Sequence, residues 1–411
     1  MSTREIDSPY AWFRLAVSIL LSTVGGGGMW SVVVALPAVQ AEFGAARGGA
    51  SLPFTLTMIG FAVGGVVMGR LADKVGILTP LMIGAVSLGV GYALASLSDS
   101  LWQFALAYGL LIGGFGTAAT FVPLLADISH WFEKRRGIAV ALCACGNYLA
   151  GATWPKIVEY GIRVHGWRET HLWMGIFCVV AMIPLALLLR GHAPVRSAGA
   201  APLAGPRFGM MGLSPGKLQG LLAVAGLACC VAMSMPQVHI VAYCSDLGYG
   251  VARGAEMLSL MLGFGIVSRV ASGFVADRIG GLPTMLIGSV MQGVALLMYM
   301  ISDGLTSLYI ISAIFGLFQG GLVPSYAIVI RECFPANQAG GRVGLVMMMT
   351  LLGMALGGWM SGVIFDMTGS YRAAFANGVL WNALNLAIAL YLLNRRRTNP
   401  QQAAGAAAVV A

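Results

Sequence analysis

Arg269 is the residue of this sequence whose type and position most clearly suggest chemistry. It lies in a long run of apolar and small residues, and Gly265, Ser268, Ser272 and Gly273 are its neighbours on a helix. Small neighbours leave space for a guanidinium group, which can bind a carboxylate through two parallel hydrogen bonds. The alternative is a structural arginine that packs between helices or extends toward the nearer membrane surface.

A second candidate is His239, within the stretch Pro236-Gln237-Val-His239-Ile-Val-Ala-Tyr243. Pro236 should kink a helix here, and His239 and Tyr243 are four residues apart, so they share a helix face. Histidine titrates near neutral pH, so His239 can carry a proton or donate a hydrogen bond to a carboxylate. Its alternative role is that of a hydrogen-bonded wall residue. Gln237 on the same stretch is a further ligand candidate.

Several other polar side chains interrupt apolar runs. Each can contact a ligand or form a hydrogen bond between helices, and the sequence favours neither role. These residues are Thr117, Thr120, Asn147, Tyr148, Gln319 and Tyr326. Lys156 and Glu159, three residues apart near the end of one apolar run, are predicted to form an ion pair.

The composition shows which elements must position these residues. Of 411 residues, 58% are hydrophobic and 9% are charged, whereas soluble domains have about 25% charged residues. The chain is therefore predicted to be a polytopic membrane protein in contact with a lipid bilayer, which excludes most classes of soluble enzyme. The seven cysteines lack zinc-type spacing, so neither a metal site nor a cofactor is expected.

The apolar runs predict an all-α protein with twelve transmembrane helices. Each run is continuously apolar and about 20 residues long, whereas strands of a β-barrel are about 10 residues long and alternate in polarity. The predicted spans are 12–37, 52–72, 78–97, 101–125, 137–158, 170–190, 219–241, 255–276, 282–301, 307–330, 343–365 and 372–393.

The chain also contains an internal repeat. Gly69-Arg-Leu-Ala-Asp73-Lys-Val-Gly76 follows the second span, and Gly273-Phe-Val-Ala-Asp277-Arg-Ile-Gly280 follows the eighth, 204 positions later. Trp167-Arg168 and Tyr371-Arg372 recur at the same offset. Two landmarks at one offset predict two pseudo-symmetric six-helix bundles of the same orientation.

The polar, proline-containing stretch between the sixth and seventh spans separates these bundles. We expect an N-terminal bundle over 12–190, a cytoplasmic linker over 191–217, a C-terminal bundle over 218–394 and a disordered tail over 395–411.

The distribution of basic residues predicts the orientation. If both termini are cytoplasmic, seventeen Lys and Arg residues fall inside and six outside, and Arg269 lies within a span. This bias favours cytoplasmic termini and a multi-pass protein of the cell inner membrane. It also explains the net charge of +9 without a nucleic-acid partner.

The loop Gly69–Gly76 resembles the G-x-L-a-D-[RK]-x-G signature of the major facilitator superfamily, and Gly273–Gly280 stands where that family has its second copy. The segment Trp131-Phe-Glu-Lys-Arg-Arg-Gly137 is similar to a loop of the monocarboxylate porters and the oxalate/formate antiporter group. The resemblance extends over nearly the whole chain, from Trp12 to Arg397. It implies two bundles that rock around a midplane site and so give alternating access.

The resemblance also implies a gating role for the residues of these loops. Asp73 would latch one conformation against a neighbouring helix end or basic residue; the alternative is a turn whose charges are simply solvated. The gating candidates are Arg70, Asp73, Lys74, Arg136, Asp277 and Arg278.

In the monocarboxylate porters, a substrate-binding arginine of the eighth span precedes the loop Asp or Asn by eight residues, which is the spacing of Arg269 and Asp277. The match has departures. The stretch Leu258–Leu262 lacks the Asp and Arg of the eukaryotic members, the first span lacks their lysine, and the eleventh lacks the second cation of the oxalate antiporter. One cation suits a monocarboxylate better than a dicarboxylate.

The sequence therefore predicts a secondary transporter of small organic anions, mainly monocarboxylates, driven by protons or by anion exchange and acting as a monomer. His239 is the candidate for the proton, because the carboxylates lie near the ends of spans. The alternative within the same fold is an exporter of hydrophobic drugs or other metabolites. A membrane enzyme or primary pump is disfavoured, because the sequence has no phosphate-binding loop and no H-E-x-x-H motif.

Overall fold

The computed structural model describes residues 6–191 and 211–398, which form helices and short turns and contain no β-strand. The helices are α1 (Pro9–Gly25), α2 (Gly27–Phe43), α3 (Arg47–Ala50), α4 (Leu52–Val75), α5 (Leu78–Ser96), α6 (Leu101–Leu106), the π-helix η1 (Ala107–Thr117), α7 (Val122–Trp131), α8 (Arg136–His165), α9 (Trp167–Leu188), α10 (Pro215–Asp246), α11 (Val251–Ile279), α12 (Gly281–Ile301), α13 (Leu305–Gln319), α14 (Leu322–Cys333), α15 (Ala336–Thr368) and α16 (Tyr371–Thr398).

These helices make twelve candidate membrane spans of 19 to 35 residues, which confirms the predicted fold class. A span needs about 20 apolar residues, so each is long enough to cross a bilayer. Four spans consist of more than one helix: the first of α1 and α2, the second of α3 and α4, the fourth of α6, η1 and α7, and the tenth of α13 and α14.

Glycines allow the helices within each half to approach closely. A Cβ atom on Gly64 of α4 would lie 1.7 Å from the carbonyl oxygen of Gly114 in η1. In the second half, a Cβ atom on Gly320 would lie 2.1 Å from the carbonyl oxygen of Gly265 in α11. Only glycine fits at such backbone contacts. The second and fourth spans thus pack as the eighth and tenth do, as the repeat predicts.

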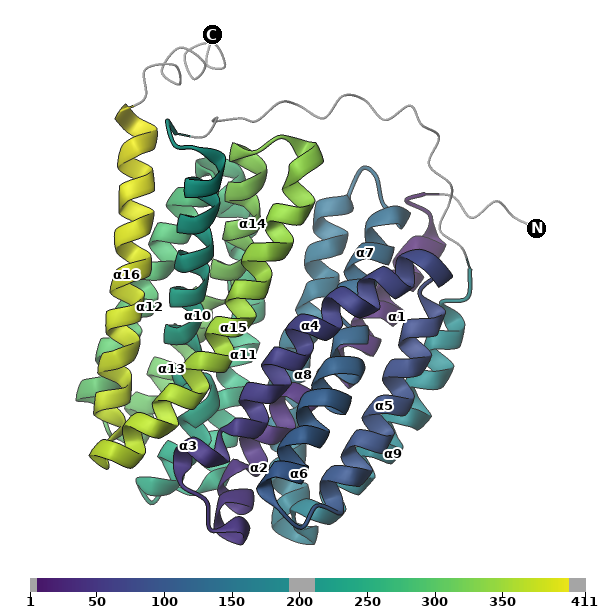
Figure 1. Ribbon diagram of the computed structural model, residues 1–411, viewed down its shortest axis with the longest axis vertical. Coiled ribbons are helices and arrows are strands. Elements are labelled where there is room, and N and C mark those ends of the chain that lie inside the picture. Colours follow the sequence, from purple (N-terminus) through teal and green to yellow (C-terminus); the bar gives the residue numbers. More distant parts are fainter. Residues whose placement is uncertain (1–5, 192–210, 399–411) are drawn as a thin grey trace.

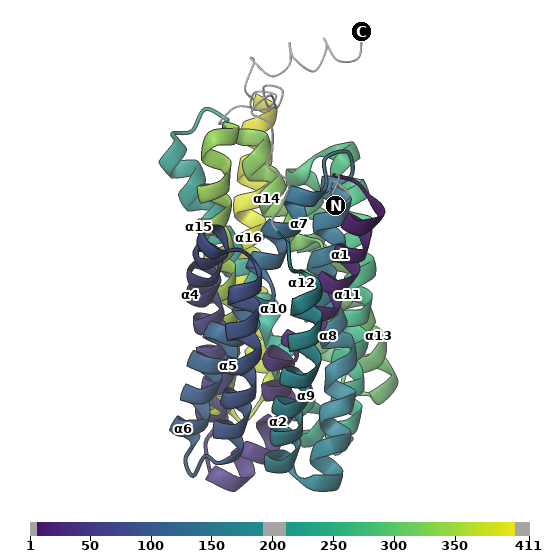
Figure 2. The same cartoon turned by 90° about the vertical axis from the view of Figure 1, so that its right-hand side faces the viewer.

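The two halves, α1–α9 and α10–α16, stand side by side (Figure 1). They meet through α8 against α11, α4 against α15 and α2 against α10. The terminal end is the end where α1 begins and α16 ends, and it also holds α7 and α14 (Figure 2). The opposite, distal end holds α3 and α6 (Figure 1).

The predicted boundaries of the linker and the tail need small corrections. α10 begins at Pro215, inside the predicted linker 191–217, and residues 192–210 of that linker lie outside the described residues. α16 continues to Thr398, so residues 395–398 belong to a helix and not to the predicted tail 395–411. The end of an apolar run marks where the chain leaves the lipid, and helical hydrogen bonds can continue beyond that point. Residues 399–411 are not described.

A buried ion pair was not predicted. The side chain of Arg14 in α1 is fully buried, and its Nε donates to Asp127 Oδ2 of α7 at 2.7 Å. Its Nη1 donates to the carbonyl oxygen of Leu189 at 2.9 Å, and its guanidinium lies 4.7 Å from the centre of the Trp131 ring. Arg269 is therefore not the one charged residue within a span. Because Asp127 neutralises Arg14, this pair ties the first half together at the terminal end.

The predicted pair of Lys156 and Glu159 is wrong. Glu159 pairs with Arg163 at 3.3 Å, because residues four apart lie on the same face of α8. Within the described parts of the chain, Lys156 has no ion-pair partner within 4 Å.

Candidate functional site

Arg269 lies on α11 where the two halves meet. Its Nη1 donates to the carbonyl oxygen of Ala144 in α8 at 3.1 Å, and its Nε to that of Gly320, between α13 and α14, at 3.4 Å. The guanidinium carbon lies 4.4 Å from the centre of the Tyr148 ring of α8. The side chain is half-buried. Arg269 thus contacts both halves of the protein.

Small residues on α11 make this geometry possible. A Cβ atom on Gly265 would lie 2.3 Å from Cε1 of Tyr148, so glycine lets the tyrosine ring enter the seam between α8 and α11. The hydroxyl of Ser268 accepts the backbone N–H of Gly321 at 3.2 Å, which fixes the break in the tenth span beside the arginine.

Among the described residues, no acidic side chain neutralises the charge of Arg269. No carboxylate of the described residues lies within 4 Å of its guanidinium group. Two carbonyl dipoles and one aromatic face orient the group, but they cancel its charge far less than an acidic side chain would. A cation at membrane depth that is held this way is suited to bind an anion.

Two predicted ligand residues, Asn147 and Tyr148, lie on α8, the helix whose Ala144 carbonyl binds Arg269. Tyr148 forms the aromatic face, and its neighbour Asn147 has an Oδ1 atom that is buried and takes no hydrogen bond from the described residues. The backbone carbonyl of Asn147 accepts the indole N–H of Trp30 at 3.3 Å, which ties α8 to α2. Asn147 therefore presents an unused acceptor beside the first span.

Gln237 and Gln319 form a hydrogen-bonded pair within the second half of the protein. Nε2 of Gln237 in α10 donates to Oε1 of Gln319 in α13 at 2.6 Å. Gln319 is fully buried, its own Nε2 has no hydrogen-bond partner among the described residues, and it immediately precedes Gly320, whose carbonyl holds Arg269. A buried donor without a partner is unfavourable, so this amide is a natural contact for a bound ligand.

Other candidates lie within one half of the protein. Tyr326 donates to Asn385 Oδ1 of α16 at 2.7 Å, inside the second half. Thr120 donates to the carbonyl oxygen of Thr117 at 2.9 Å, inside the first half. Both are buried and both have their hydrogen bonds satisfied. The structure therefore does not bring Tyr326 or Thr120 to Arg269.

His239 is also separate from Arg269. It is fully buried, its Nε2 lies 2.8 Å from the carbonyl oxygen of Gly358 in α15, and its Nδ1 lies 3.3 Å from the hydroxyl of Tyr371. None of these partners contacts Arg269. The sequence analysis also missed a second buried histidine within a span, His171, which contacts the hydroxyl of Tyr108 at 2.6 Å.

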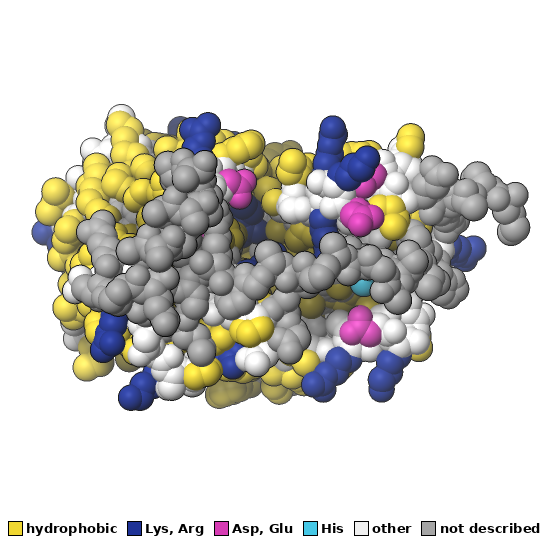
Figure 3. Space-filling model, turned by 90° about the horizontal axis from the view of Figure 1, so that it is seen from above, with side chains coloured by type: hydrophobic (Ala, Val, Ile, Leu, Met, Phe, Trp, Pro, Cys, Tyr) yellow, Lys and Arg dark blue, Asp and Glu magenta, His cyan; other side chains and the backbone are white. Residues whose placement is uncertain are grey.

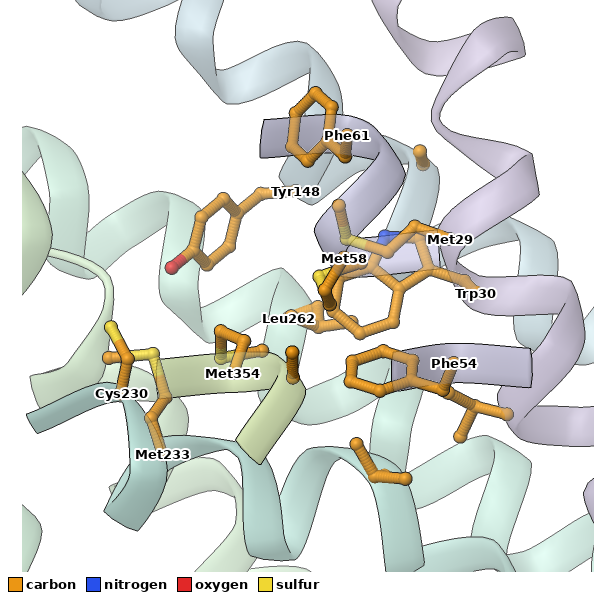
Figure 4. Packing of buried hydrophobic residues seen from close by; sticks show 14 of the residues in the cluster. Met29, Trp30, Phe54, Met58, Phe61, Tyr148, Cys230, Met233, Leu262 and Met354 are labelled. Atoms are coloured by element: carbon orange, nitrogen blue, oxygen red, sulfur yellow. The ribbon is translucent and has the colours of Figure 1, made fainter. Parts of the chain in front are cut away.

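Methionine and aromatic side chains are packed together where the two halves meet. Figure 4 shows residues of the first half facing those of the second, with the Tyr148 ring between them. All of them are buried or nearly so. These residues are Met29, Trp30, Phe54, Met58 and Phe61 from the first half, and Cys230, Met233, Leu262 and Met354 from the second. Such surroundings suit the apolar body of a ligand.

The distal end carries a latch between the halves that the sequence analysis did not find. Nη2 of Arg47 lies 3.0 Å from both carboxylate oxygens of Asp246 at the end of α10. The carboxylate of Asp366 in α15 accepts the backbone N–H groups of Arg47 and Gly48 at 2.8 and 2.7 Å. We call Arg47, Gly48, Asp246 and Asp366 the distal latch. In the sequence, the signal for this latch is that Arg47, Asp246 and Asp366, which have opposite charges, lie between predicted spans on the same side of the membrane.

The terminal end differs from the distal end. The six predicted gating residues there are all exposed, and basic side chains stand around the edge of this face (Figure 3). Within the described residues, Asp73 and Asp277 have no ion-pair partner within 4 Å. In this structure the halves are therefore held together by charges at the distal end and not by these two carboxylates.

Comparison with known proteins agrees with this architecture. The family model described as Major Facilitator Superfamily matches residues 18–307 and again 257–410. Monocarboxylate transporter 13 of Bos taurus is 30% identical over 327 residues, which cover 78% of this chain and 75% of that protein. The MFS-type transporter pynF of Aspergillus niger is 28% identical over 74% of this chain and 69% of that protein.

A solved structure has the same fold. It is the crystal structure of a bacterial homologue of the human lysosomal transporter Spinster, in an inward-facing and occupied conformation. The two structures superpose with a TM-score of 0.69 at 15% sequence identity, over 96% of this chain and 99% of the other. The family match over most of the sequence, the twelve spans and this fold together show that the chain belongs to the major facilitator superfamily of membrane transporters.

Proposed function

We propose that this transporter moves small organic anions, chiefly monocarboxylates, by alternating access. The observation that carries the proposal is Arg269, a cation between the halves without an acidic partner among the described residues. It offers one positive charge for one carboxylate, while the methionine and aromatic side chains of Figure 4 offer an apolar surface for the rest of the anion. The relatives named monocarboxylate transporters support this substrate class.

Unpaired polar atoms support a site around Arg269. Nε2 of Gln319 can donate to a carboxylate oxygen, and Oδ1 of Asn147 can accept a hydroxyl or amino hydrogen from the substrate. We propose Arg269, Tyr148, Asn147, Gln319 and Gln237 as the binding residues. Tyr326 and Thr120 are not proposed as binding residues, because the hydroxyl group of each already forms its hydrogen bonds within one half of the protein.

The decisive experiment is uptake into proteoliposomes. Radiolabelled lactate, pyruvate, formate and oxalate are compared, with and without a pH gradient. We expect saturable uptake of monocarboxylates and weaker uptake of oxalate, because one guanidinium neutralises one charge. Absence of saturable uptake for all four anions would refute the proposed substrate class.

Export of hydrophobic compounds is a second candidate function. The apolar lining between the halves favours it, and some relatives are fungal MFS-type transporters. Such cargo would not need the charge of Arg269, so efflux of lipophilic dyes that persists in Arg269→Ala would favour this function over the first.

We further propose that the termini are cytoplasmic, that the protein resides in the inner membrane as a monomer, and that the terminal end is the cytoplasmic one. Basic side chains on that face support this orientation (Figure 3). With this orientation, the closed distal latch gives the inward-facing state.

Asp73→Asn tests the proposed gate at the terminal end. We expect transport to slow by about tenfold, because the carboxylate forms a charged contact in the state that is closed at this end. Substrate affinity should hardly change, because Asp73 is exposed in the last turn of α4 and is not among the contacts of Arg269. Initial rates and substrate binding are measured on the same preparation.

Asp99→Asn is the matched control for Asp73→Asn, because Asp99 is an exposed carboxylate in a loop at the distal end and outside the latch. It should leave the rate unchanged. If Asp73→Asn keeps the normal turnover but loses affinity, the carboxylate is not a gate.

Coupling to protons is proposed to involve His239. The ring of its partner Tyr371 lies 5.8 Å from the guanidinium carbon of Arg47, and its partner Gly358 packs against Phe54 of the first half. A proton on His239 would therefore add charge beside the distal latch, where it can change the equilibrium between states. This connection replaces the direct contact with the bound anion that the sequence analysis expected.

We expect His239→Gln to exchange substrate across the membrane but to lose accumulation driven by a pH gradient. Exchange needs no net movement of protons, so the two assays separate coupling from binding. His171→Gln is the matched control, because His171 is equally buried but contacts residues of the first half alone. Accumulation by His239→Gln at the wild-type level would show that this histidine carries no coupled proton.

A further inference from the structure

A cavity of about 420 Å³ opens on the flank of the protein between α8, α11 and α13. Phe264 and Val267 of α11 line it and are 38% and 54% exposed, so its mouth faces the lipid. Lys156 of α8 and Glu256 of α11 lie at the same cavity. The cavity therefore combines an apolar entrance from the bilayer with one charge of each sign.

Both Lys156 and Glu256 can form further ion pairs or hydrogen bonds. Lys156 has no ion-pair partner among the described residues, although it interacts electrostatically with Glu256. Oε2 of Glu256 accepts hydrogen bonds from Arg253 at 3.0 Å and from the hydroxyl of Tyr309, whereas its Oε1 accepts none from the described residues. An ammonium and a carboxylate that are close but not in contact leave room for a group between them.

Ser259 provides independent evidence for a ligand. It lines the same cavity, its side chain is 5% exposed, and its hydroxyl has no hydrogen-bond partner in the described structure. Buried hydroxyl groups without a partner are rare, because they lose their bonds to water and gain none. A ligand in the cavity would provide the missing acceptor.

We propose that this cavity binds a zwitterionic head group with a phosphodiester and a primary ammonium, and that its source is phosphatidylethanolamine from the bilayer. The phosphate would contact Lys156 and accept the hydroxyl hydrogen of Ser259, and the ammonium would donate to Oε1 of Glu256. An acyl chain would lie along Phe264 and Val267. A choline head group fits less well, because its quaternary ammonium has no N–H to donate.

The site joins the two halves of the transporter. Lys156 belongs to the first half, whereas Glu256 and Ser259 belong to the second, and α8 and α11 form the largest contact between the halves. A lipid bound to both helices would stabilise this contact. The inference is independent of the transported substrate, because it concerns the flank of the protein and not Arg269.

The test is native mass spectrometry of the purified full-length protein with dioleoyl phosphatidylethanolamine or dioleoyl phosphatidylcholine. We expect about tenfold preferential retention of phosphatidylethanolamine, the effect of one charged hydrogen bond. Equal retention of the two lipids by the wild type would overturn the proposal without any variant. Soluble glycerophosphoethanolamine should not displace the lipid at millimolar concentration; displacement would show that the head group alone, and not the phospholipid, is the ligand.

Variants localise the binding to the cavity. Glu256→Gln should reduce retention of phosphatidylethanolamine to that of phosphatidylcholine, because it removes the charged acceptor of the primary ammonium. Lys156→Gln should reduce retention of both lipids, because both carry the phosphate, and Lys156→Arg should restore it. Arg163→Gln is the matched control, because Arg163 is a basic residue of the same helix that does not line the cavity. Unchanged preference in Glu256→Gln, or unchanged retention of both lipids in Lys156→Gln, would place the lipid elsewhere and overturn the assignment.

Discussion

Arg269→Lys and Arg269→Ala are both expected to reduce anion uptake into proteoliposomes by about 100-fold or more, the effect of two lost charged hydrogen bonds. Lysine keeps the charge but not the planar group that contacts Tyr148 at 4.4 Å and reaches carbonyls on both sides of the seam. The measurement is the initial rate of uptake over a range of substrate concentrations.

The control for Arg269 is Arg331→Lys, an exposed arginine near the terminal end of α14. It should transport normally. Size-exclusion profiles and thermal unfolding of each variant show whether a loss of uptake reflects misfolding. Wild-type kinetics in Arg269→Lys would contradict a bidentate contact with the substrate, and wild-type kinetics in Arg269→Ala would contradict any contact.

Asp366→Asn is expected to open the distal end. The carboxylate of Asp366 accepts two backbone N–H groups at the start of α3, where the helix end carries a partial positive charge. Loss of these charged hydrogen bonds should increase the population of the distal-open state by about tenfold or more. Transport should become slower, because the state closed at the distal end is part of each cycle.

The population can be measured by electron-electron double resonance between spin labels at Ala41 of α2 and Ser307 of α13, which are exposed near the distal end in different halves. The seven native cysteines are buried, so labels should attach at the introduced ones. In Asp366→Asn, the distribution of distances between the two labels should gain a component at longer distance.

Asp303→Asn is the matched control for the latch. Hydrogen bonds from Tyr243 and Arg372 hold the pKa of Asp303 below its usual value, so this residue is a charged carboxylate at the same end, but all its partners belong to the second half. It should leave the distances unchanged. If Asp366→Asn does so too, the latch does not hold the halves together.

The spans were predictable because apolar runs of sufficient length have few other uses in a sequence. Their ends were not: the second span was expected to end at residue 72, but α4 continues to Val75, because its hydrogen bonds extend past the apolar stretch. The break of the first span at Gly26 was missed as well, because glycine is common in transmembrane helices and does not by itself indicate an interruption.

For the site, the sequence identified side chains but not their neighbours. Arg269 was found because a charge inside an apolar run is unfavourable unless it has a use. Its contacts with Ala144 and Gly320 come from other spans, more than 50 positions away, and no local pattern encodes them. The contacts of His239 with Gly358 and Tyr371 likewise come from other spans and are not encoded locally. Arg47 was counted as a loop cation, because its acidic partners lie near the ends of two helices that are distant in the sequence, α10 and α15.

The distal latch also bears on how this sequence can vary. Asp366 binds the main chain at positions 47 and 48, and every amino acid except proline supplies the same N–H groups. The side chain at position 47 can therefore change during evolution. The ion pair with Asp246 would then be lost, but the contacts of Asp366 with the backbone would remain. Position 48 has no such freedom, because a Cβ atom there would lie 2.8 Å from Cγ2 of Val363. Homologues that close in this way should keep a glycine and a carboxylate, even where the arginine has been replaced.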